Sequence, residues 1–196
     1  DPYLGGGTHL PDIYVYMPIF FENNLIGFAA VIAHHTDIGG RVAGGNACDN
    51  TEIYQEGLRI PPAKLYEQGK PNKTLFDIIE KNVRVPVKVM GDLCAQLAAC
   101  HIAEKAFLDL IKRYGVGTVL MYMEEVINYA ERMTRAAISA LPDGVHSFED
   151  WIDDDGIDLG KPIRIHVTIT KNGDRLSADW TGSSPQVKGA INGTLG

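Results

Sequence analysis

Two apolar runs of strand length constrain most what this chain can fold into. They occupy residues 13–20 and 26–33, and only five residues separate them: Phe21-Glu22-Asn23-Asn24-Leu25. Asn tolerates a positive φ, so the Asn23-Asn24 pair can form a two-residue type I′ turn. The pattern therefore predicts an antiparallel β-hairpin near the N-terminus.

The base of this hairpin gathers histidines and carboxylates. Counting back from the predicted turn places Asp12 opposite His35. Because side chains alternate along a strand, Asp12, His35 and Asp37 are expected on one face, with His34 on the other. His9 lies just before the first strand, where three glycines let the backbone bend. A loop longer or shorter by one residue would exchange the roles of His34 and His35.

Imidazoles and carboxylates gathered in this way are typical ligands of a divalent metal. We expect His9, Asp12, His35 and Asp37 as metal ligands. Asp37 and His34 are the candidate catalytic groups. Asp37 could orient an imidazole ligand or accept a proton, and His34 could pack against the ligands or hydrogen-bond to them without binding the metal. Nitrogen and oxygen ligands without thiolate suit Zn, Mn, Fe or Co. The alternative is a polar turn in which the histidines only cap loops.

Composition narrows the classes of function. The chain has 196 residues, 45% of them hydrophobic, and a net charge of −7. Without a basic stripe, nucleic acid and anionic membrane are not expected as partners, and no apolar run is long enough to span a bilayer. Three cysteines do not make a disulfide framework, so a cytoplasmic protein is expected. Cys94 and Cys100 are expected to be buried in a helix.

Strands are followed by helices and then by strands again, which predicts an α+β fold rather than alternating βαβ units. We expect a metal-site hairpin with loops over residues 1–73, a helical region over 74–141 and C-terminal strands over 142–196. The helical region divides into a short helix capped by Thr74 and two long amphipathic helices, over 89–114 and 118–141. Their short glycine-containing link predicts an antiparallel helical hairpin.

The C-terminal region contains a second hairpin signal. Asn172-Gly173 separates an alternating strand at residues 163–169 from a return strand at 176–180, and that turn would place His166 opposite Asp179. The run Asp153-Asp154-Asp155 lacks the spacing of a calcium loop and predicts a solvated acidic turn. The N-terminal glycines match neither GxGxxG nor a P-loop, so no nucleotide site is expected in this chain.

Several segments, taken together and in order, resemble the hydantoinase B family. They are DPYLGGGTHLPDI, AHHTDIGG, EGLRIPP, NVRVP, GDLCAQ, LPDG and ADWTGSSPQVKGAIN. This family is known for the B component of ATP-dependent N-methylhydantoinase, the corresponding half of 5-oxoprolinase, and the α subunits of acetone and acetophenone carboxylases. The resemblance covers essentially the whole chain, although members of the family are considerably longer, so the sequence is expected to be a fragment. It departs from the family in having three glycines before Thr8, where two are usual.

The resemblance implies an ATP-dependent, ring-opening amidohydrolase for hydantoins, 5-oxoproline or related lactams. A hydantoinase A-type subunit or domain would bind ATP-Mg and phosphorylate the carbonyl oxygen, and water activated at the metal of the B component would attack the carbon. Carried over by motif, the metal ligands would be His9, Asp12 and either His35 or His34. Asp37 would be a further ligand or would hydrogen-bond to a ligand. The expected assembly is a hetero-oligomer acting on a small cyclic amide or ketone.

Two alternatives remain. The first is an ATP-dependent carboxylase of acetone or acetophenone type, in which an activated enol attacks CO2 near the metal. The second is a non-catalytic assembly module that docks the ATP-hydrolysing subunit through the helical hairpin. A product that depends on bicarbonate would indicate the first, and copurification of a partner without turnover would indicate the second.

Overall fold

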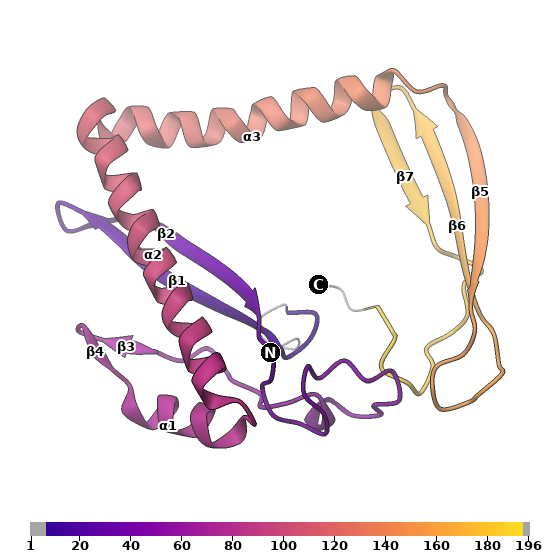
Figure 1. Cartoon of the computed structure of the whole chain (residues 1–196). Coiled ribbons are helices and arrows are strands. Elements are labelled where there is room, and N and C mark those ends of the chain that lie inside the picture. The colour runs from indigo at the N-terminus through magenta and orange to yellow at the C-terminus, as the bar shows by residue number, and fades with distance from the viewer. Residues whose placement is uncertain (1–6, 194–196) are drawn as a thin grey trace. The chain divides into compact units, whose positions relative to one another are not determined.

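The computed structural model describes residues 7–193, which form two compact units (Figure 1). Within the described residues, the first unit holds residues 7–107 and 188–193, and the second holds Leu108–Val187. Both mix helices with small antiparallel sheets, as the sequence predicts. None of the helices in the described part of the chain is long and apolar enough to cross a membrane.

The first unit is built on the predicted hairpin of β1 (Asp12–Phe21) and β2 (Asn24–His34). Side chains alternate along both strands, and Val15 and Ala29 of the inner face are buried. Helix α2 (Pro86–Tyr114) begins in this unit and lies against that face, with the Cys100 Sγ within 4.0 Å of the carbonyl oxygens of Val15 and Ala29. One face of α2 closes the core with Val89, Leu93, Gln96 and Cys100.

The predicted register of this hairpin was wrong by one residue. The turn consists of Glu22 and Asn23, with φ of 49° and 65°, and not of Asn23-Asn24. That change alone would shift each cross-strand partner by two positions. An irregularity between Ile19 and Phe20 shifts the partners back by one position, because the partner changes there from Gly27 to Leu25. The net error in the predicted register is therefore one residue. Asp12 therefore lies opposite His34.

Turn-rich chain connects β2 to the helices, with short elements inside it as its length suggests. These are a 3-10 helix η1 (Ile53–Gln55), strands β3 (Tyr66–Glu67) and β4 (Lys70–Pro71), and helix α1 (Lys73–Asn82). The N-cap of α1 is Asn72, whose side chain accepts a hydrogen bond from the Leu75 amide at 3.2 Å, so Thr74 was wrongly predicted as the cap.

The two long helices occur close to where they were predicted. Pro86 begins α2, a position at which proline is tolerated because the first helical N–H has no partner in the helix. Gly115, with φ of 83°, separates α2 from α3 (Val116–Ser139). The predicted apolar stripe of α3 is exposed at Met123, Val126, Ile127 and Met133. Because α2 passes from one unit into the other, its antiparallel packing with α3 stays a prediction.

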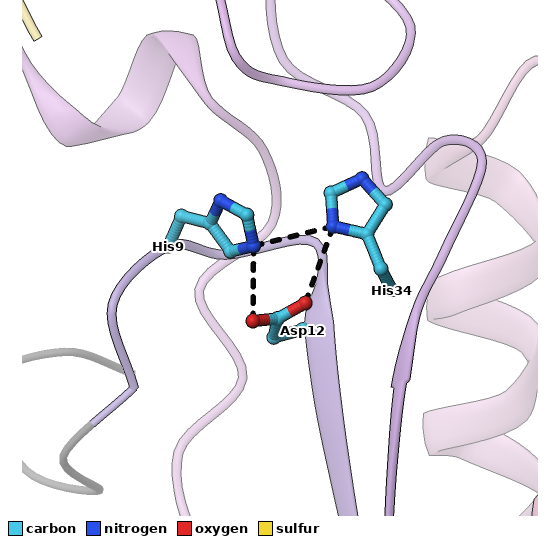
Figure 2. Close-up of side chains that lie close together, drawn as sticks. All are labelled: His9, Asp12 and His34. Atoms are coloured by element: carbon cyan, nitrogen blue, oxygen red, sulfur yellow. Dashed lines mark hydrogen bonds and ion pairs between the residues drawn. The ribbon is translucent and has the colours of Figure 1, made fainter. Parts of the chain in front are cut away.

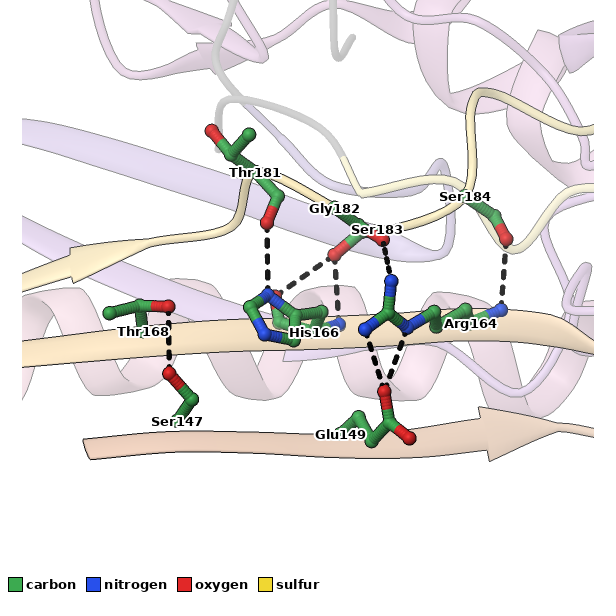
Figure 3. A network of polar contacts seen from close by, with 9 residues as sticks. All are labelled: Ser147, Glu149, Arg164, His166, Thr168, Thr181, Gly182, Ser183 and Ser184. Atoms are coloured by element: carbon green, nitrogen blue, oxygen red, sulfur yellow. Dashed lines mark hydrogen bonds and ion pairs between the residues drawn. The ribbon is translucent and has the colours of Figure 1, made fainter.

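The second unit contains a three-stranded antiparallel sheet of β5 (Gly144–Ile152), β6 (Ile163–Asn172) and β7 (Arg175–Asp179). The β6–β7 hairpin was predicted, but its turn is Gly173-Asp174, so Asp179 lies opposite Thr168 and not His166. His166 Nδ1 is instead 2.9 Å from the Thr181 carbonyl oxygen (Figure 3). Strand β5, which contains His146, was not predicted.

Polar contacts fix the loops of this sheet. Arg164 of β6 pairs with Glu149 of β5 at 2.6 Å and donates to the Gly182 carbonyl (Figure 3). Asp155, predicted as part of a solvated turn, is buried and accepts hydrogen bonds from the Ile157 and Asp158 amides. The acidic run is therefore held by backbone amides of the residues that follow it.

The three cysteines are free thiols. Cys100 is buried, as predicted, whereas Cys94 is exposed and was wrongly expected in the core. Burial raises the pKa of the Cys100 thiol. A buried thiol of raised pKa is a poor nucleophile, which agrees with its interpretation as a core residue.

Candidate metal centre

Three side chains converge at the base of the hairpin: His9, Asp12 and His34 (Figure 2). The Asp12 carboxylate lies between the two imidazoles, with Oδ2 3.0 Å from His9 Nε2 and Oδ1 3.2 Å from His34 Nδ1. The two imidazole nitrogens are 3.2 Å apart. The three side chains thus form a triangle that offers two imidazole nitrogens and a carboxylate, and one ligand atom from each residue can be chosen so that all three lie within 4.8 Å of one another.

Local structure explains how the three side chains meet. Asp12 begins β1 and His34 ends β2, and the two are cross-strand partners, so their side chains leave the same face of the sheet. His9 lies three residues before Asp12, in the turn that leads into β1. The group is partly open, with exposed side-chain fractions of 27% for His9, 18% for Asp12 and 46% for His34.

The short distances within this triangle are similar to those between ligands of one metal ion. Ligands bound about 2.1 Å from a metal, at tetrahedral or octahedral angles, lie about 3.0–3.4 Å from each other. The spacing of 3.2 Å between the two imidazole nitrogens falls in that range, as does the distance of 3.0–3.2 Å from each imidazole to its own oxygen of Asp12. Two imidazoles and one carboxylate on one side of an ion also leave positions open for water or substrate. The residues present therefore fit a divalent metal.

His35, the histidine predicted as a ligand, lies on the inner face of the hairpin. Its side chain is buried, with 1% of the residue exposed, and its Nε2 is 2.9 Å from Gln96 Oε1 on α2. His34, which was predicted to point away from the cluster, takes the place expected of His35. The exchange follows directly from the one-residue error in register.

Asp37 also lies apart from the triangle. Its carboxylate is fully buried and accepts hydrogen bonds from the Gly39 amide, the Arg84 amide and the Arg84 guanidinium, the last at 2.9 Å. The Arg84 guanidinium also donates hydrogen bonds to the carbonyl oxygens of Gly39 and Gly40. Asp37 thus joins the loop after β2 to the segment before α2, and its oxygens are engaged by the protein itself.

Sequence reasoning missed the part played by Gln96. The signal was a polar residue at helical spacing among the apolar residues Val89, Leu93 and Cys100, on the face that α2 presents to the hairpin. A buried amide on an apolar helix face needs hydrogen-bond partners. Those partners are His35 and backbone carbonyls of both strands.

Comparisons with known proteins show the family of this chain. The family model for hydantoinase B/oxoprolinase matches residues 1–196. The chain is 40% identical over 191 residues to a Pseudomonas sp. (strain NS671) protein provisionally named as the B component of a D-/L-hydantoinase, covering 95% of this chain and 32% of that protein. It is 36% identical to the beta chain of the caprolactamase of Pseudomonas jessenii, covering 97% of this chain and 32% of the relative. The chain thus spans about a third of the length of these relatives.

Solved structures show the same fold. The crystal structure of the ATP-dependent caprolactamase from Pseudomonas jessenii matches with a TM-score of 0.86 and 36% identity over 96% of this chain and 32% of that chain. A nucleotide-free structure of acetone carboxylase matches with a TM-score of 0.86 over 95% of this chain and 26% of that chain; at 21% identity it supports the fold alone. The chain belongs to the hydantoinase B/oxoprolinase family.

Proposed function

We propose that this chain carries the metal centre of the B component of an ATP-dependent, ring-opening amidohydrolase. The observation that supports this most is the triangle of His9, Asp12 and His34. It differs from the ligand set expected from the sequence in having His34 in place of His35 and in lacking Asp37. When bound, a divalent metal at this point supplies Lewis acidity and lowers the pKa of a coordinated water molecule.

Contacts among the three side chains already hold them together in the absence of a metal. Each oxygen of the Asp12 carboxylate contacts one imidazole nitrogen, and these two contacts orient both rings toward the carboxylate. Because these three groups would be engaged as ligands, a substrate would occupy the open side of the cluster. The exposed side of His34 leaves that position open to a small molecule.

The proposed substrate is a hydantoin, 5-oxoproline or a related lactam. The relatives named as components of a hydantoinase and of a caprolactamase support a cyclic amide. Amides are poor electrophiles, so activation of the carbonyl oxygen by phosphorylation would be needed before attack. We assign that step, with ATP-Mg, to a hydantoinase A-type partner, because this sequence has no phosphate-binding motif and its relatives are named as subunits.

The test uses the full-length protein purified with its ATP-binding partner. We expect close to one divalent transition metal per chain and ring opening that depends on ATP, measured with hydantoin, 5-oxoproline and caprolactam. The double variant His9→Ala/His34→Ala should lose metal and turnover together. His101→Ala removes an exposed histidine of α2 and serves as the matched control. Full metal retention in the double variant would contradict the proposed centre.

The same preparation distinguishes the alternatives. Consumption of bicarbonate with acetone or acetophenone, and no lactam opening, would indicate a carboxylase, a reaction class that the fold shared with acetone carboxylase permits. The exposed apolar side chains of α3 favour a role in assembly as well. A stable complex with the ATP-hydrolysing partner but no turnover of either kind would leave assembly as the function.

A further inference from the structure

The Gln96 side chain links α2 to both strands of the metal-site hairpin. It is 3% exposed, its Nε2 donates to the Ile13 carbonyl of β1 at 2.8 Å and lies 3.5 Å from the Val31 carbonyl of β2, and its Oε1 is 2.9 Å from His35 Nε2. Only the NH2 end of an amide can donate to carbonyls, so its oxygen faces His35 and accepts from that ring. In the described part of the chain, His35 Nδ1 has no hydrogen-bond partner, so Gln96 is the polar anchor of the ring.

These contacts are made to the chain neighbours of two residues of the triangle. Ile13 follows Asp12, and His35 follows His34. Because successive side chains of a strand point to opposite faces, a contact that holds His35 on the inner face turns His34 outward. The contact to the Ile13 carbonyl likewise fixes the strand next to Asp12. Gln96 thus acts on the cluster from the other side of the sheet.

The hairpin needs such a constraint because its apolar pattern defines register poorly. The outer face is also apolar: Tyr14, Tyr16, Phe28 and Ile32 are 40%, 61%, 59% and 52% exposed. With apolar residues on both faces, burial alone discriminates weakly between one register and a slip by one residue. Such a slip would exchange His34 and His35, and it would leave the buried Gln96 amide without its partners.

We propose that Gln96 is a positioning residue that holds His34, and not His35, in the His9–Asp12–His34 cluster. This inference rests on the proposed metal centre. Gln96 touches neither metal nor substrate; it acts through His35 and through the strand backbone. The variant Gln96→Met, of similar length and without hydrogen-bonding groups, should therefore weaken the metal site in a protein that still folds.

The experiment measures Co2+ binding to the full-length protein by titration and by the visible absorption of the bound ion, which reports ligand number and symmetry. For Gln96→Met we expect affinity to fall about 10–100-fold, the usual effect of removing a group that orients a ligand, with an altered absorption spectrum. His35→Leu removes the same contact from the hairpin and should behave alike. The double variant should lose little more than either single variant.

Cys100→Ala is the matched control. Cys100 lies one helical turn beyond Gln96 and is likewise buried against the hairpin, but it contacts the carbonyls of Val15 and Ala29. It should lower stability and leave Co2+ affinity and spectrum unchanged. Unchanged binding in folded Gln96→Met or His35→Leu would overturn the proposal, and so would an equal loss in Cys100→Ala. If instead His9→Ala/His34→Ala bound Co2+ as the wild type does, the metal centre itself would be wrong.

Discussion

His34 lies directly opposite Asp12 in the N-terminal hairpin, with 3.2 Å between His34 Nδ1 and Asp12 Oδ1. The next residue, His35, is buried on the other face. Two adjacent histidines therefore have separate roles: His34 belongs to the candidate metal centre, and His35 belongs to the core. The difference can be measured directly.

Replacing each histidine by alanine should give different phenotypes. His34→Ala should lose most of the metal affinity, while the free energy of unfolding changes by no more than about 0.5 kcal/mol, as for other exposed sites. His35→Ala should cost about 2 kcal/mol or more, because it opens a cavity and leaves Gln96 Oε1 unpaired. Its metal affinity should fall less than that of His34→Ala. Urea unfolding and chelator competition measure the two effects, and the reverse ranking of metal affinities would contradict the observed register.

Asp37 should contribute to stability rather than to metal binding. Asp37→Asn removes the charge of a fully buried carboxylate that pairs with Arg84, which is half-exposed. We expect a loss of about 2–3 kcal/mol, below the range of a fully buried pair because solvent screens Arg84, with metal content unchanged. Asp77→Asn, which breaks the exposed pair with Lys73, is the control and should cost at most about 0.5 kcal/mol. Loss of metal from folded Asp37→Asn would restore Asp37 as a ligand candidate.

Substitutions of two glycines test how tightly the loop after β2 is packed. Gly40 and Gly44 have similar φ, +76° and +83°, but a Cβ on Gly40 would lie 2.4 Å from the Gln55 carbonyl oxygen, whereas a Cβ on Gly44 meets nothing within 4 Å. Gly44→Ala should cost about 1–2 kcal/mol from backbone strain alone. Gly40→Ala should cost clearly more in urea unfolding, because backbone must also move. Equal losses would mean that the contact with Gln55 relaxes freely.

Much of the secondary structure could be predicted from the sequence because its signals are local. Two apolar runs of strand length located β1 and β2, and helical spacing located α2 and α3. The exact register could not be predicted, since the turn at Glu22-Asn23 and the irregularity at Ile19 and Phe20 shift it in opposite directions. Both faces of the hairpin are apolar, so the pattern gave no independent check.

The candidate site shows the same limit. His9 and Asp12 could be proposed as ligands from spacing within one short segment. The choice between His34 and His35 follows from the hairpin register, and the contact of His35 with Gln96, some sixty residues away, gave no local signal. Asp37 was taken for a ligand because its partner Arg84 is distant in the sequence. Residue type alone cannot reveal such long-range pairing.

Cysteine reactivity should follow burial along α2. Cys94 is exposed, whereas Cys100 is buried and the pKa of its thiol is raised by that burial. A thiol reagent at neutral pH should leave Cys100 unmodified until the protein unfolds, since the thiolate is the reactive form. Trypsin leaves both cysteines in one peptide, residues 89–105, so tandem mass spectrometry of that peptide is used to distinguish the two sites. Modification of Cys100 as fast as Cys94 in native protein would contradict the packing of α2 on the hairpin.

The last prediction concerns pH and the sheet of the second unit. The ammonium group of Lys171 lies 2.7 Å from Asp143, and the Gly173 amide donates to the same oxygen at 3.0 Å. Both lower the pKa of Asp143 below its ordinary value of 3.8, with the lysine contact first. A depressed pKa means that the carboxylate stabilises the fold above pH 3.8, and that this contribution is lost as the pH falls through the lowered value.

NMR titration of Asp143 should therefore give a midpoint below 3.8, and Lys171→Met should move it upward toward that value. Methionine suits this test because Lys171 is only 6% exposed, so its aliphatic chain needs replacement by one of similar length. The acid side of the stability curve should lose part of its slope below about pH 4 in the variant, because only the Gly173 amide then lowers the pKa of Asp143 in the folded state. Lys161→Met, which breaks an exposed pair with Asp158, is the control and should leave the Asp143 midpoint unchanged. A midpoint at or above 3.8 in the wild type would show that Lys171 does not hold this carboxylate in solution.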